Sequence, residues 1–128
     1  MITILEKIIS YNKKIRDFEV DPSNKNIITT GENLTFLKNG VKIKEISGKV
    51  KNCDSIKHIK EKNRLFISNV FFVSTSTGNI YKGDSLKKKI IDTVFEREKV
   101  IEFIDFTTNG RIIYIENNTL YSYDTSTT

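Results

Sequence analysis

The sequence predicts an all-β protein with one N-terminal helix. Beyond residue 16, short apolar runs alternate with turns rich in Gly, Asn, Asp and Ser, the pattern of many short strands. These turn signals recur about every eight to twelve residues, which is typical of an antiparallel all-β domain. Apolar residues at the spacing of a helix face are confined to the first fifteen residues.

Residues 1–15 are predicted to form an amphipathic helix. Thr3 and Glu6 have the spacing of a capping box, in which each side chain bonds the other's backbone N–H. An isolated helix of this length is marginal in water, so we expect Leu5 and Ile8 to pack on the strands or on a partner. The apolar face of this helix would consist of Met1, Ile4, Leu5, Ile8, Tyr11 and Ile15.

Residues 16–128 are predicted to form a single β domain of twelve strands, built on a repeated plan. Each repeat has an apolar strand, a small polar turn and a second strand. Taking Leu34, Ile80 and Leu120 as equivalent gives spacings of 46 and 40 residues, which suits one four-stranded unit per repeat. The expected strands are 16–20, 26–30, 34–37, 41–46, 55–59, 65–67, 70–74, 80–83, 88–95, 100–106, 111–116 and 119–124.

These units resemble the blades of β-propeller repeats, of the PQQ-type or WD40-like variety. The match is carried in the second unit by Gly78, Asn79, Ile80, Tyr81 and Asp84, and in the third by Leu120, Tyr121 and Asp124. The resemblance implies antiparallel four-stranded blades, about three in number. The chain lacks the Gly-His and Trp-Asp pairs of WD40 blades and the Trp of PQQ-type repeats. The resemblance therefore implies no cofactor and no binding residue.

The tetrapeptide Gly83-Asp84-Ser85-Leu86 matches the nucleophile signature of a family of esterases and lipases. In those enzymes the motif follows the first strand of an α/β fold, and the base is a histidine near the C-terminus. Here the single histidine, His58, lies upstream and no helix-forming stretch follows. Gly, Asp and Ser are common turn residues, so Ser85 is predicted to lie in a turn and its replacement by Ala to be nearly neutral.

No other pattern in the chain indicates catalysis, a metal or a cofactor. His58 is predicted to be a half-exposed strand residue, with a Cys53–His58 catalytic pair as the alternative interpretation. One His and one Cys do not make a zinc site without carboxylates, and the chain has no P-loop, GxGxxG or HExxH motif. The sequence therefore predicts a protein that is not an enzyme.

The net charge of +5 is concentrated in the middle of the chain. Between Lys38 and Arg64, nine basic residues accompany three acidic ones. Such a region can attract nucleic acid, but solvated lysines on the outer faces of strands are the favoured interpretation. The predicted interaction surface consists of Lys42, Lys44, Lys49, Lys51, Lys57, Lys60, Lys62 and Arg64.

The remaining features predict an intracellular, non-enzymatic interaction or scaffold module. A single cysteine and the absence of a signal-peptide pattern favour a cytoplasmic or nuclear protein, and the uncharged stretch 65–81 is too short and polar to span a membrane. Three blades are too few to close, since propellers have about four to eight. We therefore expect self-association or a protein partner, acting through blade loops and strand edges. The alternative function is docking on RNA or a ribonucleoprotein through residues 38–64.

Overall fold

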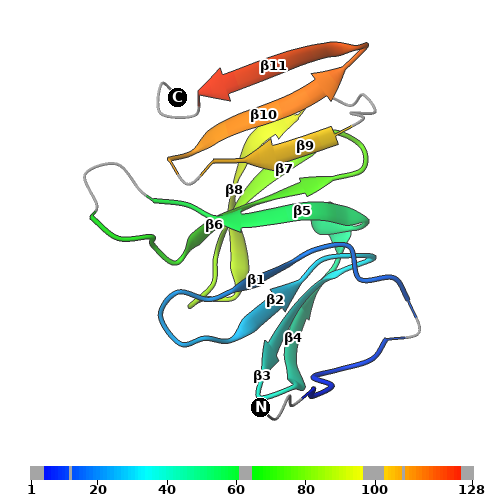
Figure 1. Ribbon diagram of the computed structural model, residues 1–128, viewed down its shortest axis with the longest axis vertical. Coiled ribbons are helices and arrows are strands. Elements are labelled where there is room, and N and C mark those ends of the chain that lie inside the picture. Colours follow the sequence, from blue (N-terminus) through cyan, green and yellow to red (C-terminus); the bar gives the residue numbers. More distant parts are fainter. Residues whose placement is uncertain (1–4, 12, 61–64, 97–102, 108, 125–128) are drawn as a thin grey trace.

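Three antiparallel sheets, packed face to face, make up the computed structural model (Figure 1). The structure describes residues 5–11, 13–60, 65–96, 103–107 and 109–124. In each sheet the strands are hydrogen-bonded in chain order. The first sheet contains β1 (Phe18–Val20), β2 (Ile27–Thr29), β3 (Leu34–Lys38) and β4 (Val41–Ile46).

The second sheet follows a short 3-10 helix and has four strands, and the third has three. The helix is η1 (Gly48–Val50), and the second sheet contains β5 (Cys53–His58), β6 (Val70–Thr75), β7 (Asn79–Asp84) and β8 (Lys89–Glu96). The third sheet contains β9 (Phe103–Phe106), β10 (Arg111–Glu116) and β11 (Thr119–Asp124). The first strands of neighbouring sheets contact each other, β1 beside β5 and β5 beside β9. The described strands thus form antiparallel sheets in chain order, as the repeats predicted, with four strands in the first two sheets and three in the third.

Two hydrophobic cores hold the sheets together, and β6 contributes to both. Phe71 and Val73 pack in the core shared with the first sheet, whereas Val70 and Phe72 pack in the core shared with the third. Successive strand residues point to opposite faces, so a sheet buried on both sides needs an unbroken apolar run. The run Val70–Val73 meets this requirement, and it marks the second sheet as the centre of the molecule.

The predicted strand 65–67 is wrong. Among the described residues of the connection between β5 and β6, the stretch 65–67 has no strand structure. The reason lies in the pairing: β5 and β6 bond each other directly, with His58 opposite Phe71. Residues 65–67 therefore pair with neither strand, and an apolar run does not form a strand without a neighbouring strand edge.

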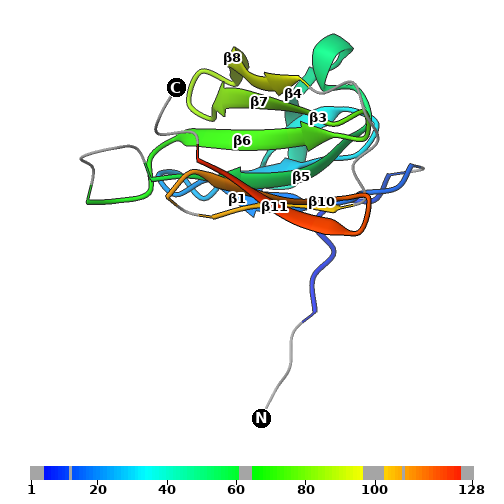
Figure 2. The ribbon, with the colours of Figure 1, turned by 90° about the horizontal axis from the view of Figure 1, so that it is seen from above.

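The predicted N-terminal helix is also wrong. Residues 5–11 and 13–15 have no helical structure, and residues 1–4 and 12 lie outside the described part of the chain. Arg16 N–H donates to the Thr30 carbonyl at 3.1 Å, which fixes this segment beside the first sheet. A Cβ at Gly31 would lie 2.6 Å from the Lys14 carbonyl oxygen, so the backbones meet closely there. Leu5, expected to be buried, is 96% exposed, and this end of the segment projects from the sheets (Figure 2).

The N-terminal segment, residues 5–15, covers part of the front face, which we define as the side of the first sheet turned away from the second. Thr35 and Leu37 lie on this side and are buried, although none of the described sheets packs against it. The segment lines two shallow pockets there, Tyr11 and Lys13 beside Thr35 and Ile8 beside Leu37. A chain that is not helical can cover more of a sheet per residue than a helix, which rises only about 1.5 Å per residue.

Two leucine substitutions test this cover. Leu37→Ala is expected to lower the free energy of unfolding by about 2–5 kcal/mol, because Leu37 is 1% exposed and the change leaves a cavity. Leu5→Ala is expected to change it by less than about 0.5 kcal/mol, because that side chain is in solvent. Urea titration of both variants gives the comparison. Equal losses would contradict the position of the segment.

Candidate interaction surfaces

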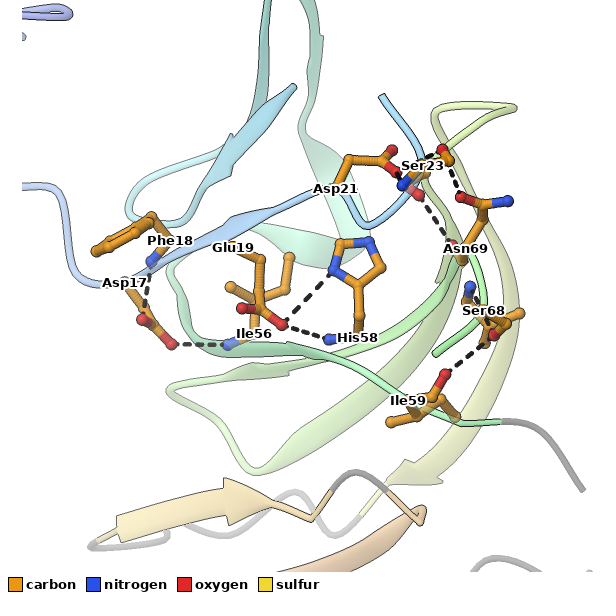
Figure 3. Close-up of polar contacts among 12 residues, drawn as sticks. Asp17, Phe18, Glu19, Asp21, Ser23, Ile56, His58, Ile59, Ser68 and Asn69 are labelled. Carbon is orange, nitrogen blue, oxygen red and sulfur yellow. Dashed lines mark hydrogen bonds and ion pairs between the residues drawn. The ribbon is translucent and has the colours of Figure 1, made fainter. Parts of the chain in front are cut away.

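Acidic side chains on β1 join the first sheet to the second. Asp17 and Asp21 flank β1 and Glu19 lies at its centre, so the three side chains are two residues apart and point toward the second sheet. Asp17 Oδ2 accepts a hydrogen bond from the Ile56 N–H at 3.0 Å, and Glu19 Oε1 accepts one from the His58 N–H at 2.5 Å (Figure 3). Since β5 pairs with a strand only on its β6 side, these carboxylates satisfy backbone donors at its other edge.

His58 is a strand residue, as predicted, but the expectation that it is half exposed is wrong. Its ring is buried edge-on against Phe71, with the ring centroids 5.7 Å apart. Its Nδ1 lies 3.5 Å from Glu19 Oε1. The thiol of Cys53 has a different neighbour, the Gly31 carbonyl at 3.4 Å, and burial raises its pKa. These surroundings give no support to a Cys53–His58 catalytic pair.

Ser85 lies in the turn between β7 and β8, as predicted, but it is buried. Its hydroxyl donates to the Asn69 carbonyl at 3.0 Å. The neighbouring Gly83 has no room for a side chain, because a Cβ there would lie 2.3 Å from the Phe71 ring. Packing and turn geometry therefore account for the Gly-Asp-Ser sequence. Because the Ser85 hydroxyl is buried and bonded, its removal is expected to be destabilising and not nearly neutral.

Asp21 is the buried centre of a polar cluster at the end of β1. Its Oδ1 accepts hydrogen bonds from the N–H of Ser23 at 2.9 Å and from its hydroxyl at 2.8 Å (Figure 3). Burial alone raises the pKa of the Asp21 carboxyl. The hydrogen bonds from Ser23 and Ser85 and the proximity of His58 outweigh burial, so the pKa is lowered. The ionised carboxylate is thus the form that the fold holds.

The structure spreads the predicted basic surface over two sheets. Lys42 and Lys44 lie on β4 at the outer edge of the first sheet, whereas Lys57 lies on β5, the first strand of the second. Lys51 follows η1, and Lys60 follows β5 with its side chain exposed. The backbone of Lys49 lies in η1, while Lys62 and Arg64 lie outside the described residues.

The contacts of Lys42 are with an acidic side chain. A hydrogen bond to Glu45, with the ammonium 2.8 Å from a carboxylate oxygen, raises the pKa of Lys42, and the same bond lowers the pKa of Glu45. This pair therefore offers little free positive charge. Binding by the basic residues as a group stays a prediction.

The described part of the loop between β5 and β6 presents consecutive apolar side chains to solvent. Leu65 is 84% exposed and Phe66 is 80% exposed, and Ile67 beside them is also exposed. The sequence pattern predicts a strand over residues 65–67, so it does not reveal this surface. Its signal was the apolar run Leu-Phe-Ile directly after the basic residues.

A second uncovered surface is the back face, which we define as the side of the third sheet turned away from the second. The strand register places Asp105, Ile113, Ile115, Leu120 and Ser122 there. The opposite side, with Ile112 and Tyr114, packs in the second core. Leu120 is 69% exposed and no described residue forms a layer over it.

The described residues offer no site for a metal and no membrane-crossing helix. They contain no group of three or more His, Cys, Asp and Glu residues that could hold a metal ion. Within the same part of the chain, no helix has the length and apolar character needed to cross a membrane.

Comparison with known proteins places the fold. No protein-family model and no curated protein matches the sequence. Among solved structures, the WD40 β-propeller domain of Doa1 is similar, with a TM-score of 0.62 and 17% sequence identity over 91% of this chain. The match covers 44% of that chain, so the present sequence spans less than half of its length. The chain has the fold of part of a WD40-like β-propeller.

The bonding of Ser85 gives a mutational test. Ser85→Ala is expected to lower the free energy of unfolding by about 1–3 kcal/mol, because it removes a buried donor that serves a backbone carbonyl and supports Asp21. Leu86→Ala, in the same turn but exposed, is the control and should cost less than about 0.5 kcal/mol. Thermal unfolding of both variants measures the difference, and a neutral Ser85→Ala would contradict the burial of the hydroxyl.

Asp21 gives a pH dependence. A carboxyl whose pKa is lower in the folded state stabilises that state above its unfolded pKa of about 3.9, and the stabilisation is lost as pH falls through the folded value. Unfolding measured between about pH 6 and pH 2 should therefore show a loss of stability below about pH 4 that is smaller in Asp21→Asn. An identical acid dependence in the two proteins would show that the carboxylate is not held ionised by the fold.

Proposed function

We propose that the protein is a non-enzymatic interaction module that works within a larger assembly and binds a partner protein through its blade loops. The observation that carries this proposal is the exposed apolar stretch of Leu65, Phe66 and Ile67. Contiguous exposed apolar surface is uncommon on soluble monomers, and where it occurs it often marks a binding site. Aromatic residues are also enriched at the centres of protein interfaces.

The chemistry of this loop favours a protein over a nucleic acid. Phosphate groups are bound by cations and N–H donors, whereas Leu65 and Ile67 offer only apolar surface. Burying apolar area contributes about 25 cal/mol per Å², so a pocket that receives Phe66 would supply a large part of the binding energy. The similarity to a WD40 propeller supports a scaffold of this kind at the level of the fold alone.

Site-specific crosslinking in the protein's own cells tests the proposal. A photo-reactive phenylalanine analogue placed at Phe66 is expected to form an adduct with a discrete polypeptide. The same analogue at Leu86, which is exposed in another turn, is the control and should form none. Both positions are in solvent, so neither substitution should disturb the fold.

The salt dependence of the adduct separates the two functions. An apolar protein contact should give the same yield at low and high salt, because it releases few counterions. An adduct that contains RNA, or one whose yield falls steeply with salt, would favour the RNA-docking alternative. Equal yields at Phe66 and Leu86 would show that the loop has no specific partner.

A further inference from the structure

We propose that the back face of one copy binds the front face of a second copy, and that two such contacts close a pair. This inference goes beyond the proposed function, because it concerns the ends of the stack of sheets and not the loop at residue 66. Its basis is a contact that the structure already contains once, between the first and second sheets. The back face contains one of the two hydrogen bonds of this contact.

The complete contact is made by Asp17. One oxygen, Oδ1, accepts the N–H of the next residue, Phe18, at 2.8 Å. The other, Oδ2, reaches the following sheet and accepts the N–H of Ile56 at 3.0 Å. One carboxylate is therefore held in position by its own strand and used to bond the first strand of the next sheet.

Asp105 repeats the first half of this arrangement. It also precedes a phenylalanine in the first strand of its sheet, and its Oδ1 accepts the Phe106 N–H at 2.8 Å. The strand register turns Asp105 to the back face, away from the second sheet. Among the described residues, no donor is recorded for its second oxygen and the side chain is exposed. A following first strand with an unbonded edge N–H, such as that of Val20 in β1, would supply the missing donor.

The two phenylalanines show what the contact buries on the other side. Phe106 is 2% exposed because it packs edge-on against Phe72 of the preceding sheet, with ring centroids 5.7 Å apart. Phe18 holds the equivalent place in the first sheet, no described residue forms a sheet against it, and it is 61% exposed. The N-terminal segment covers pockets over β2 and β3 and leaves Phe18 and Val20 of β1 uncovered.

The front and back faces are therefore complementary. The front face offers Phe18 and Val20, together with the Val20 N–H on the β1 edge that faces away from β2; the Phe18 N–H on the same edge is bonded to Asp17. The back face offers Ile113, Ile115 and Leu120 beside the carboxylate of Asp105. The contact would repeat the one between the first and second sheets, with apolar side chains packed between sheets and a carboxylate on the next first strand.

Charge favours the same orientation. The pockets along the front face are lined by five lysines, Lys7, Lys13, Lys14, Lys25 and Lys42, and by three glutamates, Glu6, Glu32 and Glu45. On the back face Arg111 lies 3.5 Å from Asp124, and no described cation is within ion-pair distance of Asp105. Lys13 and Lys42 are paired with Glu32 and Glu45, so the front pockets present Lys7, Lys14 and Lys25 against Glu6, and this excess of positive charge suits the carboxylate of Asp105. Contacts between unlike faces form closed rings or open fibres, and two copies would give six sheets, a size at which propellers close.

Complementation between two variants tests the proposal. Phe18→Lys disables the front face and Leu120→Lys disables the back face, and both residues are in solvent, so both variants should keep the native circular dichroism spectrum. By light scattering, the unmodified chain is expected at twice its mass of 14.8 kDa. Each variant alone should be monomeric, and an equimolar mixture should again form pairs through the one intact contact.

Two further variants sharpen the result. Leu86→Lys, outside both faces, is the control and should pair like the unmodified chain. Asp105→Asn should raise the dissociation constant of the pair by roughly tenfold or more, because it removes charge from the hydrogen bond. A monomer at millimolar concentration would overturn the inference. So would pairing of Phe18→Lys alone, which would indicate a back-to-back contact, or a mixture that stays monomeric. None of these outcomes bears on crosslinking at Phe66, so the two proposals fail separately.

Discussion

The structure depends on how the free edge of each sheet's first strand is satisfied. β5 pairs with β6 on one side only, so its other edge presents backbone N–H groups inside the molecule. Water has limited access there, and an unpaired buried donor costs about as much as a lost hydrogen bond. The carboxylates of Asp17 and Glu19 accept these donors and fix the first sheet against the second. Apolar packing brings the sheets together, and these bonds determine which residues meet.

This requirement explains the acidic alternation of β1. A strand with one face on an apolar core would normally place valine or isoleucine at every second position. Here Asp17, Glu19 and Asp21 take those positions, because the face toward β5 meets backbone donors and the His58 ring. The apolar residues Phe18 and Val20 are left on the outer side, where they are exposed. The strand is therefore inverted relative to a simple hydrophobic pattern, in favour of hydrogen bonding between sheets.

The sequence predicted the features that depend on the two-residue period of strands and on turn chemistry. It did not predict the features that depend on which surfaces are covered by other parts of the chain. The repeats centred on Leu34, Ile80 and Leu120 indicated blades, which the pairing of the sheets and the likeness to a WD40 propeller support. Period alone could not show that residues 5–11 and 13–15 would be non-helical beside a sheet face, or that the run at residue 65 had no edge to pair with. The alternation of acidic residues around β1 can be read from the sequence. Their role as acceptors for the N–H groups of β5 cannot, because it depends on where the fold places β5.

The same reasoning distinguishes the two ends of the stack. On the front face the chain covers its own sheet in part, since Thr35 and Leu37 are buried beneath the N-terminal segment. On the back face Asp105 is positioned by its own strand, as Asp17 is, yet no described residue uses its second oxygen. A carboxylate held in its bonding orientation loses little conformational freedom when a donor arrives, so the contact it would make is preorganised. The interaction that orders the interior is therefore also the one that the back face is built to extend.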